Sequence, residues 1–192
     1  FVSAFVLLNN NRDTDYWLMQ IDTFDPHGPF HAPEKYRRAG DSDYSGGVLN
    51  WHSYAPVDET DSEIAEIRAN YTALVRMCDA YFGKLLDYFD AHDLWKDTAL
   101  IMSTDHGFLL GEHDWWAKNR MPVYDEIAHI PLMIYHPDFA NQGGTRRSLL
   151  TQTTDIMPTL LDMCRIPIPD EVTGKSLLPS LTADQQIRES VG

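Results

Sequence analysis

The chain has 192 residues, of which 43% are hydrophobic and 11% aromatic, and its formal net charge at pH 7 is −14. This composition excludes a disordered chain, and no apolar run approaches the ~20 residues of a membrane-spanning helix, so we expect a soluble domain with a substantial core. Clustered Lys and Arg are absent, which excludes nucleic-acid binding. The two cysteines, Cys78 and Cys164, are too few for a disulfide framework or a zinc site.

The first third of the chain predicts a helix, a strand and a long loop. Phe1, Phe5 and Leu8 recur at helical spacing before a cluster of asparagines ends the pattern. Residues 16–21, from Tyr16 to Ile21, then predict a buried strand. Residues 22–59 are rich in Pro, Gly, Asp and Ser, which indicates a long irregular loop of the kind that is usually functional or mobile.

The remaining elements indicate an α/β fold. Thr60 and Glu63 match a capping box that starts the longest helix, which is predicted over residues 60–90. Ala99 to Met102 and Leu132 to Tyr135 predict strands, and residues 155–164 predict an amphipathic helix. Apolar runs without alternation are typical of strands buried on both faces. We therefore predict one mostly parallel sheet containing these two strands and residues 16–21, flanked by helices, with the long helix on one face.

A pair of metal-ligand side chains follows the strand that ends at Met102. Asp105 offers carboxylate oxygen and His106 an imidazole nitrogen, and Gly107 is expected to let the backbone turn so that both side chains aim inward. Ligands gather beyond the carboxyl ends of strands in open α/β sheets, so this position favours a site. The alternatives are a helix or turn cap for Asp105 and a hydrogen-bonded core imidazole for His106.

Two further side chains are candidates for catalysis and substrate binding. Lys118 follows two tryptophans that can shield its ammonium from water and so strengthen its attraction for a sulfate or phosphate oxygen, the alternative being a solvated lysine. His27 stands between two prolines and can donate to an ester oxygen or a leaving group, the alternative being packing against Phe24 or Phe30. Five other residues are interpreted as structural or supporting: His31, Glu112, His113, Asp114 and His129.

Four stretches together resemble the sulfatase family of the alkaline-phosphatase superfamily. They are DPHGPF at 25–30, STDHG at 103–107, LGEH at 110–113 followed by Lys118, and TDIMPTLLD at 154–162. The resemblance implies an alkaline-phosphatase-like α/β/α sandwich. It also implies a divalent cation on Asp105 and His106, with calcium expected first and magnesium or manganese as alternatives. It makes Lys118 a ligand of the transferred group. Many sulfatases carry Asn at the position of His106, whereas some sulfatases and the related phosphonate monoesterases carry His.

The family's nucleophile motif is absent from this sequence. Sulfatases use a cysteine or serine in a C-x-P-x-R context that is converted to formylglycine, and neither Cys78 nor Cys164 lies in such a context. We therefore expect residues 1–192 to be one partial domain, truncated at both ends, with residues 38–59 as a variable loop and with no turnover by themselves. The leading hypothesis is hydrolysis of small-molecule or saccharide sulfate esters by a nucleophile outside this chain. The alternatives are a phosphonate or phosphate ester hydrolase and a non-catalytic anion-binding relative.

Overall fold

The computed structural model describes residues 2–183 and 185–190. The chain divides into two compact units, which we call the helical unit (Phe1–His92 and His106–His129) and the strand unit (Asp93–Asp105 and Ile130–Gly192). Short helices in the first are η1 (Glu34–Tyr36), η3 (Glu112–Asp114) and α3 (Asp125–Ala128), and in the second η2 (Leu94–Lys96), η4 (Pro137–Gln142), η5 (Thr153–Asp155) and η6 (Leu178–Leu181). In the part of the chain that is described, no helix is both long and apolar enough to cross a membrane.

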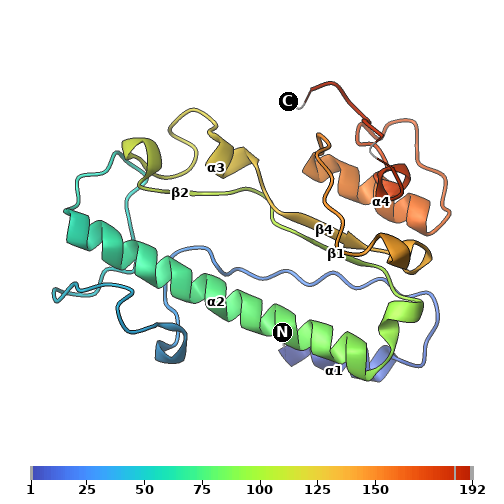
Figure 1. Ribbon diagram of the computed structural model, residues 1–192, viewed down its shortest axis with the longest axis horizontal. Coiled ribbons are helices and arrows are strands. Elements are labelled where there is room, and N and C mark those ends of the chain that lie inside the picture. The colour runs from blue at the N-terminus through green and yellow to red at the C-terminus, as the bar shows by residue number, and fades with distance from the viewer. Residues whose placement is uncertain (1, 184, 191–192) are drawn as a thin grey trace. The chain divides into compact units, whose positions relative to one another are not determined.

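The helical unit is built on α2 (Asp61–Ala91), which confirms the predicted long helix (Figure 1). The capping box forms as expected, because the backbone N–H and the hydroxyl of Thr60 both donate to the carboxylate of Glu63, at 2.9 and 2.7 Å. This bonding lowers the pKa of Glu63. The helix ends before Asp93, whose φ of 56° is left-handed and turns the chain away from the helix axis.

The apolar face of α2 forms the core of this unit. Ile67 and Leu74 on α2 pack with Phe30 from the long loop and with Trp116 and Ala117. The last two residues are β3 (Trp116–Ala117), which pairs antiparallel with β2 (Leu109–Leu110). Segment 55–57 of the long loop bonds to the same hairpin, since Trp116 N–H donates to Ala55 O at 3.0 Å. The core therefore anchors both the loop and the hairpin to α2.

Helix α1 (Val2–Asn11) confirms the first predicted helix, although Phe1 lies outside the described residues. It packs near the C-terminal end of α2, where the Phe5 and Tyr88 rings lie 5.8 Å apart and Tyr88 Oη donates to Asn9 at 3.0 Å. Leu8 is buried.

The prediction of a buried strand over residues 16–21 is wrong. The segment has no regular secondary structure, Tyr16 is fully exposed with a φ of 60°, and Leu18 is 74% exposed. Trp17, Met19 and Ile21 are half-buried and alternate with exposed neighbours, as in an extended strand. No ladder partner exists for this segment among the described residues, and apolar character alone does not make a strand without one.

The strand unit contains the two other predicted strands, β1 (Leu100–Ser103) and β4 (Leu132–Tyr135), which share one sheet as expected (Figure 1). The parallel orientation is not found, because both ladders in the described residues are antiparallel. Ser103 pairs with Leu132, so the chain leaves and re-enters the sheet at the same end. A parallel pair would need a crossover back to the opposite end. Packing of α2 on this sheet stays a prediction.

Helix α4 (Ile156–Met163) confirms the last predicted helix, and Asp155 at its start ties down the chain that follows it. The Asp155 carboxylate is fully buried. It accepts from Gln152 N–H at 2.7 Å, from Lys175 N–H at 2.8 Å and from the guanidinium of Arg188. Three donors compensate the cost of burying this charge.

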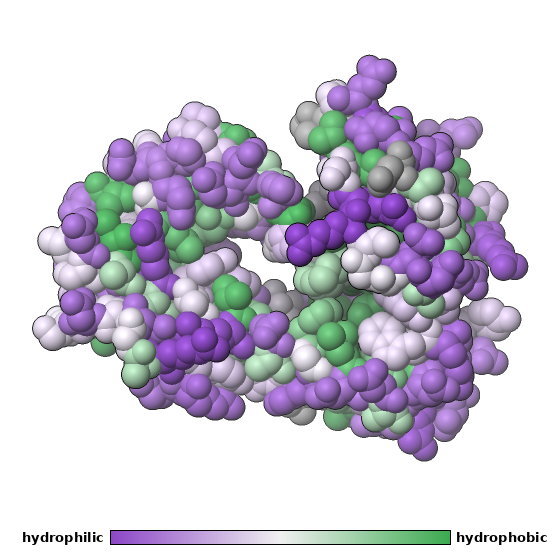
Figure 2. Space-filling model, in the orientation of Figure 1, coloured by the Kyte–Doolittle hydropathy of each residue, from purple (hydrophilic) through white to green (hydrophobic). Residues whose placement is uncertain are grey.

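The surface carries mostly polar side chains on the face that Figure 2 shows, with apolar ones scattered among them. Large apolar residues that are well exposed include Tyr16, Leu18, Phe24, Val48 and Val123. Isolated exposed apolar side chains of this kind are normal on protein surfaces.

Candidate active site

The β2–β3 hairpin and the residues after it hold an unusual concentration of left-handed backbone. Seven non-glycine residues have positive φ in the described part of the chain, and four of them lie between residues 113 and 119: His113, Asp114, Ala117 and Asn119. Ala117 and Asn119, with φ of 72° and 77°, flank Lys118 directly. Such conformations cost about 1–3 kcal/mol each and cluster at functional sites. The backbone around Lys118 is thus held in place by the packed core, in which Ala117 is fully buried.

Lys118 and His106 are in direct contact. Lys118 Nζ lies 2.5 Å from His106 Nε2, and His106 Nδ1 lies 2.9 Å from Gly107 O. A carbonyl oxygen can only accept, so Nδ1 carries the imidazole proton and Nε2 accepts from the Lys118 ammonium. The structure therefore joins two of the sequence-predicted site residues, which come from opposite sides of the hairpin.

Gly107 is required here for close contact. Its φ is not positive, so its backbone conformation does not by itself need glycine, and the expected inward turn stays a prediction. A Cβ at Gly107 would instead overlap the carbonyl oxygen of Glu126. Gly107 N–H donates to Ile127 O at 2.7 Å and Phe108 N–H to Glu126 O at 3.2 Å. These bonds fix the backbone next to His106 against α3.

Asp105 lies just beyond the end of β1, where it is exposed and accepts from the Thr104 hydroxyl at 3.3 Å. Asp105 ends the first segment of the strand unit, Asp93–Asp105, and His106 begins the second segment of the helical unit, His106–His129. The described residues contain no group of three or more His, Cys, Asp or Glu side chains arranged to hold a metal ion. A cation on Asp105 and His106 therefore stays a prediction.

His27 is half-buried on the loop at 24–31. Its Nδ1 lies 2.8 Å from Gly28 O, and its ring centroid lies 4.7 Å from that of Phe24, so contact with Phe24 is part of its environment. Because Nδ1–H is used by Gly28 O, Nε2 is the ring nitrogen that can exchange a proton with a ligand. His27 lies on a different loop from His106 and Lys118.

Two of the supporting residues, Glu112 and His113, shape the same hairpin, and a third, His31, lies on the loop at 24–31. Glu112 accepts from Leu110 N–H at 2.5 Å. The His113 ring stacks on Tyr124 with centroids 3.8 Å apart and lies 3.2 Å from the Glu126 carboxylate. Bonds from its own backbone N–H and from His113 lower the pKa of Glu126. His31 is bonded to Asn50 at 2.9 Å.

Sequence reasoning missed His52, which is 3% exposed in the middle of an aromatic cluster. Its Nδ1 donates to Ser53 O at 3.1 Å, and burial lowers the pKa of its imidazole. The signal that could have found it is the local sequence Trp51-His52-Ser53-Tyr54, which is aromatic within an otherwise polar loop.

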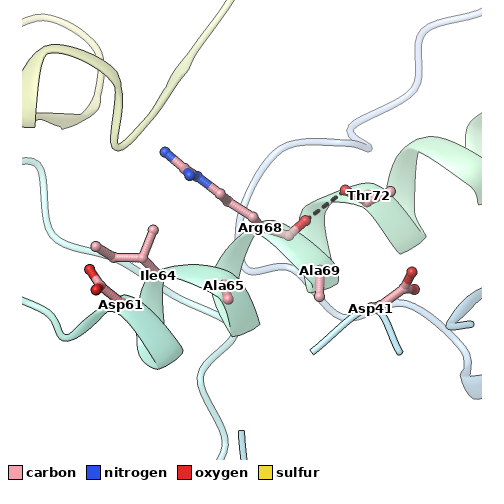
Figure 3. A pocket seen from close by; sticks show the side chains of 7 residues that line it. All are labelled: Asp41, Asp61, Ile64, Ala65, Arg68, Ala69 and Thr72. Carbon is pink, nitrogen blue, oxygen red and sulfur yellow. Dashed lines mark hydrogen bonds between the residues drawn. The ribbon is translucent and has the colours of Figure 1, made fainter. Parts of the chain in front are cut away.

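A pocket of about 510 Å³ lies elsewhere in the helical unit, along the first half of α2 (Figure 3). Ala65 and Ala69 line it between the side chains of Asp61 and Thr72, and Arg68 extends from the same helix. Arg68 Nε donates to Leu110 O at 2.7 Å, so this arginine connects α2 to the hairpin. The pocket includes none of the sequence-predicted site residues.

Comparison with known proteins identifies the family of this chain. The family model described as Sulfatase matches residues 2–166, and the chain belongs to that family. Arylsulfatase K of Gallus gallus is 36% identical over 122 residues, which cover 64% of this chain and 22% of that protein. The chain thus spans about a fifth of the length of this relative.

The chain is similar to two solved structures. The first is a protein in complex with its substrate D-glucosamine-2-N,6-O-disulfate. It is 28% identical to this chain with a TM-score of 0.58, and the match covers 68% of this chain and 26% of that chain. The second, the phosphonate monoester hydrolase of Silicibacter pomeroyi, is 30% identical, also with a TM-score of 0.58. This match covers 71% of this chain and 26% of that chain. The fold is therefore a partial α/β fold of the alkaline-phosphatase-like sulfatase type, with only short strands.

Proposed function

We propose that the full-length protein containing this chain hydrolyses sulfate monoesters, with a sulfated saccharide as the substrate class. The contact between Lys118 and His106 on a strained hairpin, in a chain of the sulfatase family, is the observation that carries the proposal. The disulfated glucosamine bound by a similar structure supports a saccharide.

Lys118 would bind the sulfate group. An ammonium carries three N–H donors, all of which are available to sulfate oxygens once Lys118 turns away from His106. Preorganised positive charge at the oxygens of a transferred group is worth most where the lysine is partly withdrawn from water, and Lys118 is half-buried. His27 would give a proton from Nε2 to the leaving oxygen. The nucleophile would come from outside these residues. In the family that this sequence resembles, the nucleophile is formylglycine.

Asp105 and His106 would hold a divalent cation, with calcium proposed first and magnesium or manganese as alternatives. Carboxylate oxygen and imidazole nitrogen are suitable donors, and further donors must come from elsewhere because such cations gather six or more. Lys118 and a cation draw on the same lone pair of His106 Nε2. The residues therefore fit a cation when the Lys118 ammonium turns from His106 to the sulfate group. A bound cation would supply additional positive charge at the sulfate oxygens.

A second candidate is hydrolysis of phosphonate monoesters. His106 stands where many sulfatases carry Asn, and a phosphonate monoester hydrolase is among the similar structures. The same Lys118 ammonium would neutralise a phosphonate as readily as a sulfate.

The test measures kcat/KM of the full-length gene product for 4-nitrophenyl sulfate, phosphate and phenylphosphonate. We expect the sulfate to be the best substrate and Lys118→Ala to lower its kcat/KM by about 100-fold or more. Lys84→Ala, which removes an exposed lysine of α2, should change nothing. Chelation should stop turnover, and calcium should restore it. A faster phosphonate reaction would favour the second candidate, and no turnover of any ester would favour an anion-binding protein. Residues 1–192 by themselves should bind metal weakly and show no turnover.

A further inference from the structure

His52 occupies the centre of the aromatic cluster in the helical unit. Its ring stacks on Trp116 with centroids 5.6 Å apart and an interplanar angle of 17°. It meets the edge of Phe108 at 4.9 Å and a tilted Phe30 at 5.3 Å. Its Nε2 is buried and has no hydrogen-bond partner in the described part of the protein. A buried polar atom without a partner destabilises the folded state, so packing of this ring must provide compensating stabilisation.

Three of the aromatic neighbours of His52 are close in sequence to a candidate site residue. Phe108 is two residues after His106, Trp116 is two residues before Lys118, and Phe30 is three residues after His27. The His52 ring is thus the common contact of the three backbone segments that carry these side chains.

The residues before His52 reinforce this connection. Asn50 O accepts from Phe30 N–H at 2.6 Å. The Trp51 ring lies so close to Gly28 that a Cβ there would approach its ring carbons to 3.0 Å. Residues 50–52 therefore contact the His27 loop through the backbone of Asn50, the ring of Trp51 and the ring of His52.

We propose that His52 is a positioning residue that fixes the His27 loop relative to the hairpin that carries His106 and Lys118. The ring, rather than its Nε2 atom, performs this role by filling the space between the two. The inference rests on the proposed function for its catalytic consequence. The geometric part concerns this chain alone and can be measured without turnover.

The geometric test uses nuclear magnetic resonance of the full-length protein with isotope-labelled histidine. We compare the assigned imidazole resonances of His27 and His106 in His52→Ala, His52→Phe and a control, Phe89→Ala, which removes a buried ring of α2. His52→Ala should shift or broaden both resonances, whereas His52→Phe and Phe89→Ala should leave them unchanged. If His52→Phe does not fold, His52→Leu takes its place as the space-filling variant. Unchanged resonances in His52→Ala would overturn the proposal.

The kinetic test uses the full-length protein and the best ester found for it. Displacement of catalytic groups by about 1 Å can cost about 100-fold, so His52→Ala should lower kcat by roughly that factor. His52→Phe should stay within a few-fold of the wild type, and Phe89→Ala should lose stability without losing kcat. Equal loss in His52→Phe and His52→Ala would show that the ring nitrogens are needed and would overturn positioning by the ring alone. Absence of turnover in the wild type would refute the proposed function, while the resonances would still decide the role of His52.

Discussion

The same substitution, glycine to alanine, should have opposite effects at two positions of the helical unit. At Gly107 a Cβ would overlap the Glu126 carbonyl oxygen, so the backbone must move apart. Introducing a methyl group into a packed contact costs about 1–3 kcal/mol. The two backbone hydrogen bonds that join residues 107 and 108 to residues 127 and 126 would weaken, at about 0.5–1.5 kcal/mol each. Gly107→Ala should therefore lower the free energy of unfolding by about 2–6 kcal/mol.

Gly83 provides the matched control. It lies inside α2, and a Cβ there meets no atom within 4 Å. Alanine is the better helix former by about 0.5–1 kcal/mol, so Gly83→Ala should stabilise the protein by that amount. Urea unfolding followed by tryptophan fluorescence measures both variants, with the denaturant slope checked for constancy. An unchanged free energy of unfolding in Gly107→Ala would refute the close-contact role of Gly107. A lower free energy of unfolding in Gly83→Ala would refute the open surroundings of Gly83 on α2.

Two further predictions concern buried and partly buried ion pairs. Asp155→Ala should leave the buried Arg188 guanidinium without its partner and lower the free energy of unfolding by about 3–5 kcal/mol, measured by urea unfolding; a loss below 1 kcal/mol would contradict this pairing. The Asp41 carboxyl has a pKa of about 2, because the Arg76 side chain, and then the Arg38 backbone N–H, donate to its charged form. A lowered carboxyl pKa stabilises the folded state fully above the usual value near 3.9 and loses that contribution as the pH falls towards 2. Asp41→Asn should therefore reduce the loss of stability between pH 5 and pH 2, and carbon resonance titration of Asp41 should give a midpoint near 2; a midpoint near 3.9 would show that the pair with Arg76 does not form.

Local sequence signals predicted the elements that depend on interactions between neighbouring residues. The capping box at Thr60 located the start of α2 to one residue, because side chain and backbone interact within a single turn. The apolar runs that became β1 and β4 were also located closely. Their antiparallel pairing could not be predicted, because apolar content does not encode strand direction. Residues 16–21 have a strand pattern, yet pairing depends on a partner that the pattern does not contain.

The candidate site also has features that the sequence predicts and features that it does not. The motifs around residues 103–107 and 110–118 placed His106 and Lys118 in one site, and these side chains are in contact. The left-handed conformation at Ala117 has no signature in the sequence, because alanine rarely adopts it and only the surrounding packing imposes it. His52 was missed because its importance comes from three rings that are distant along the chain.

The pairing of Ser103 with Leu132 brings the two ends of residues 104–131 together. These ends lie side by side, and the Ser103 hydroxyl donates to Pro131 O at 3.1 Å across this junction. The β1–β4 ladder therefore constrains only the ends of this stretch and not its length. Because Trp116 and Ala117 belong to the core of the helical unit, the positions where an insertion should be tolerated are the exposed Pro122 and Val123, and not the hairpin itself.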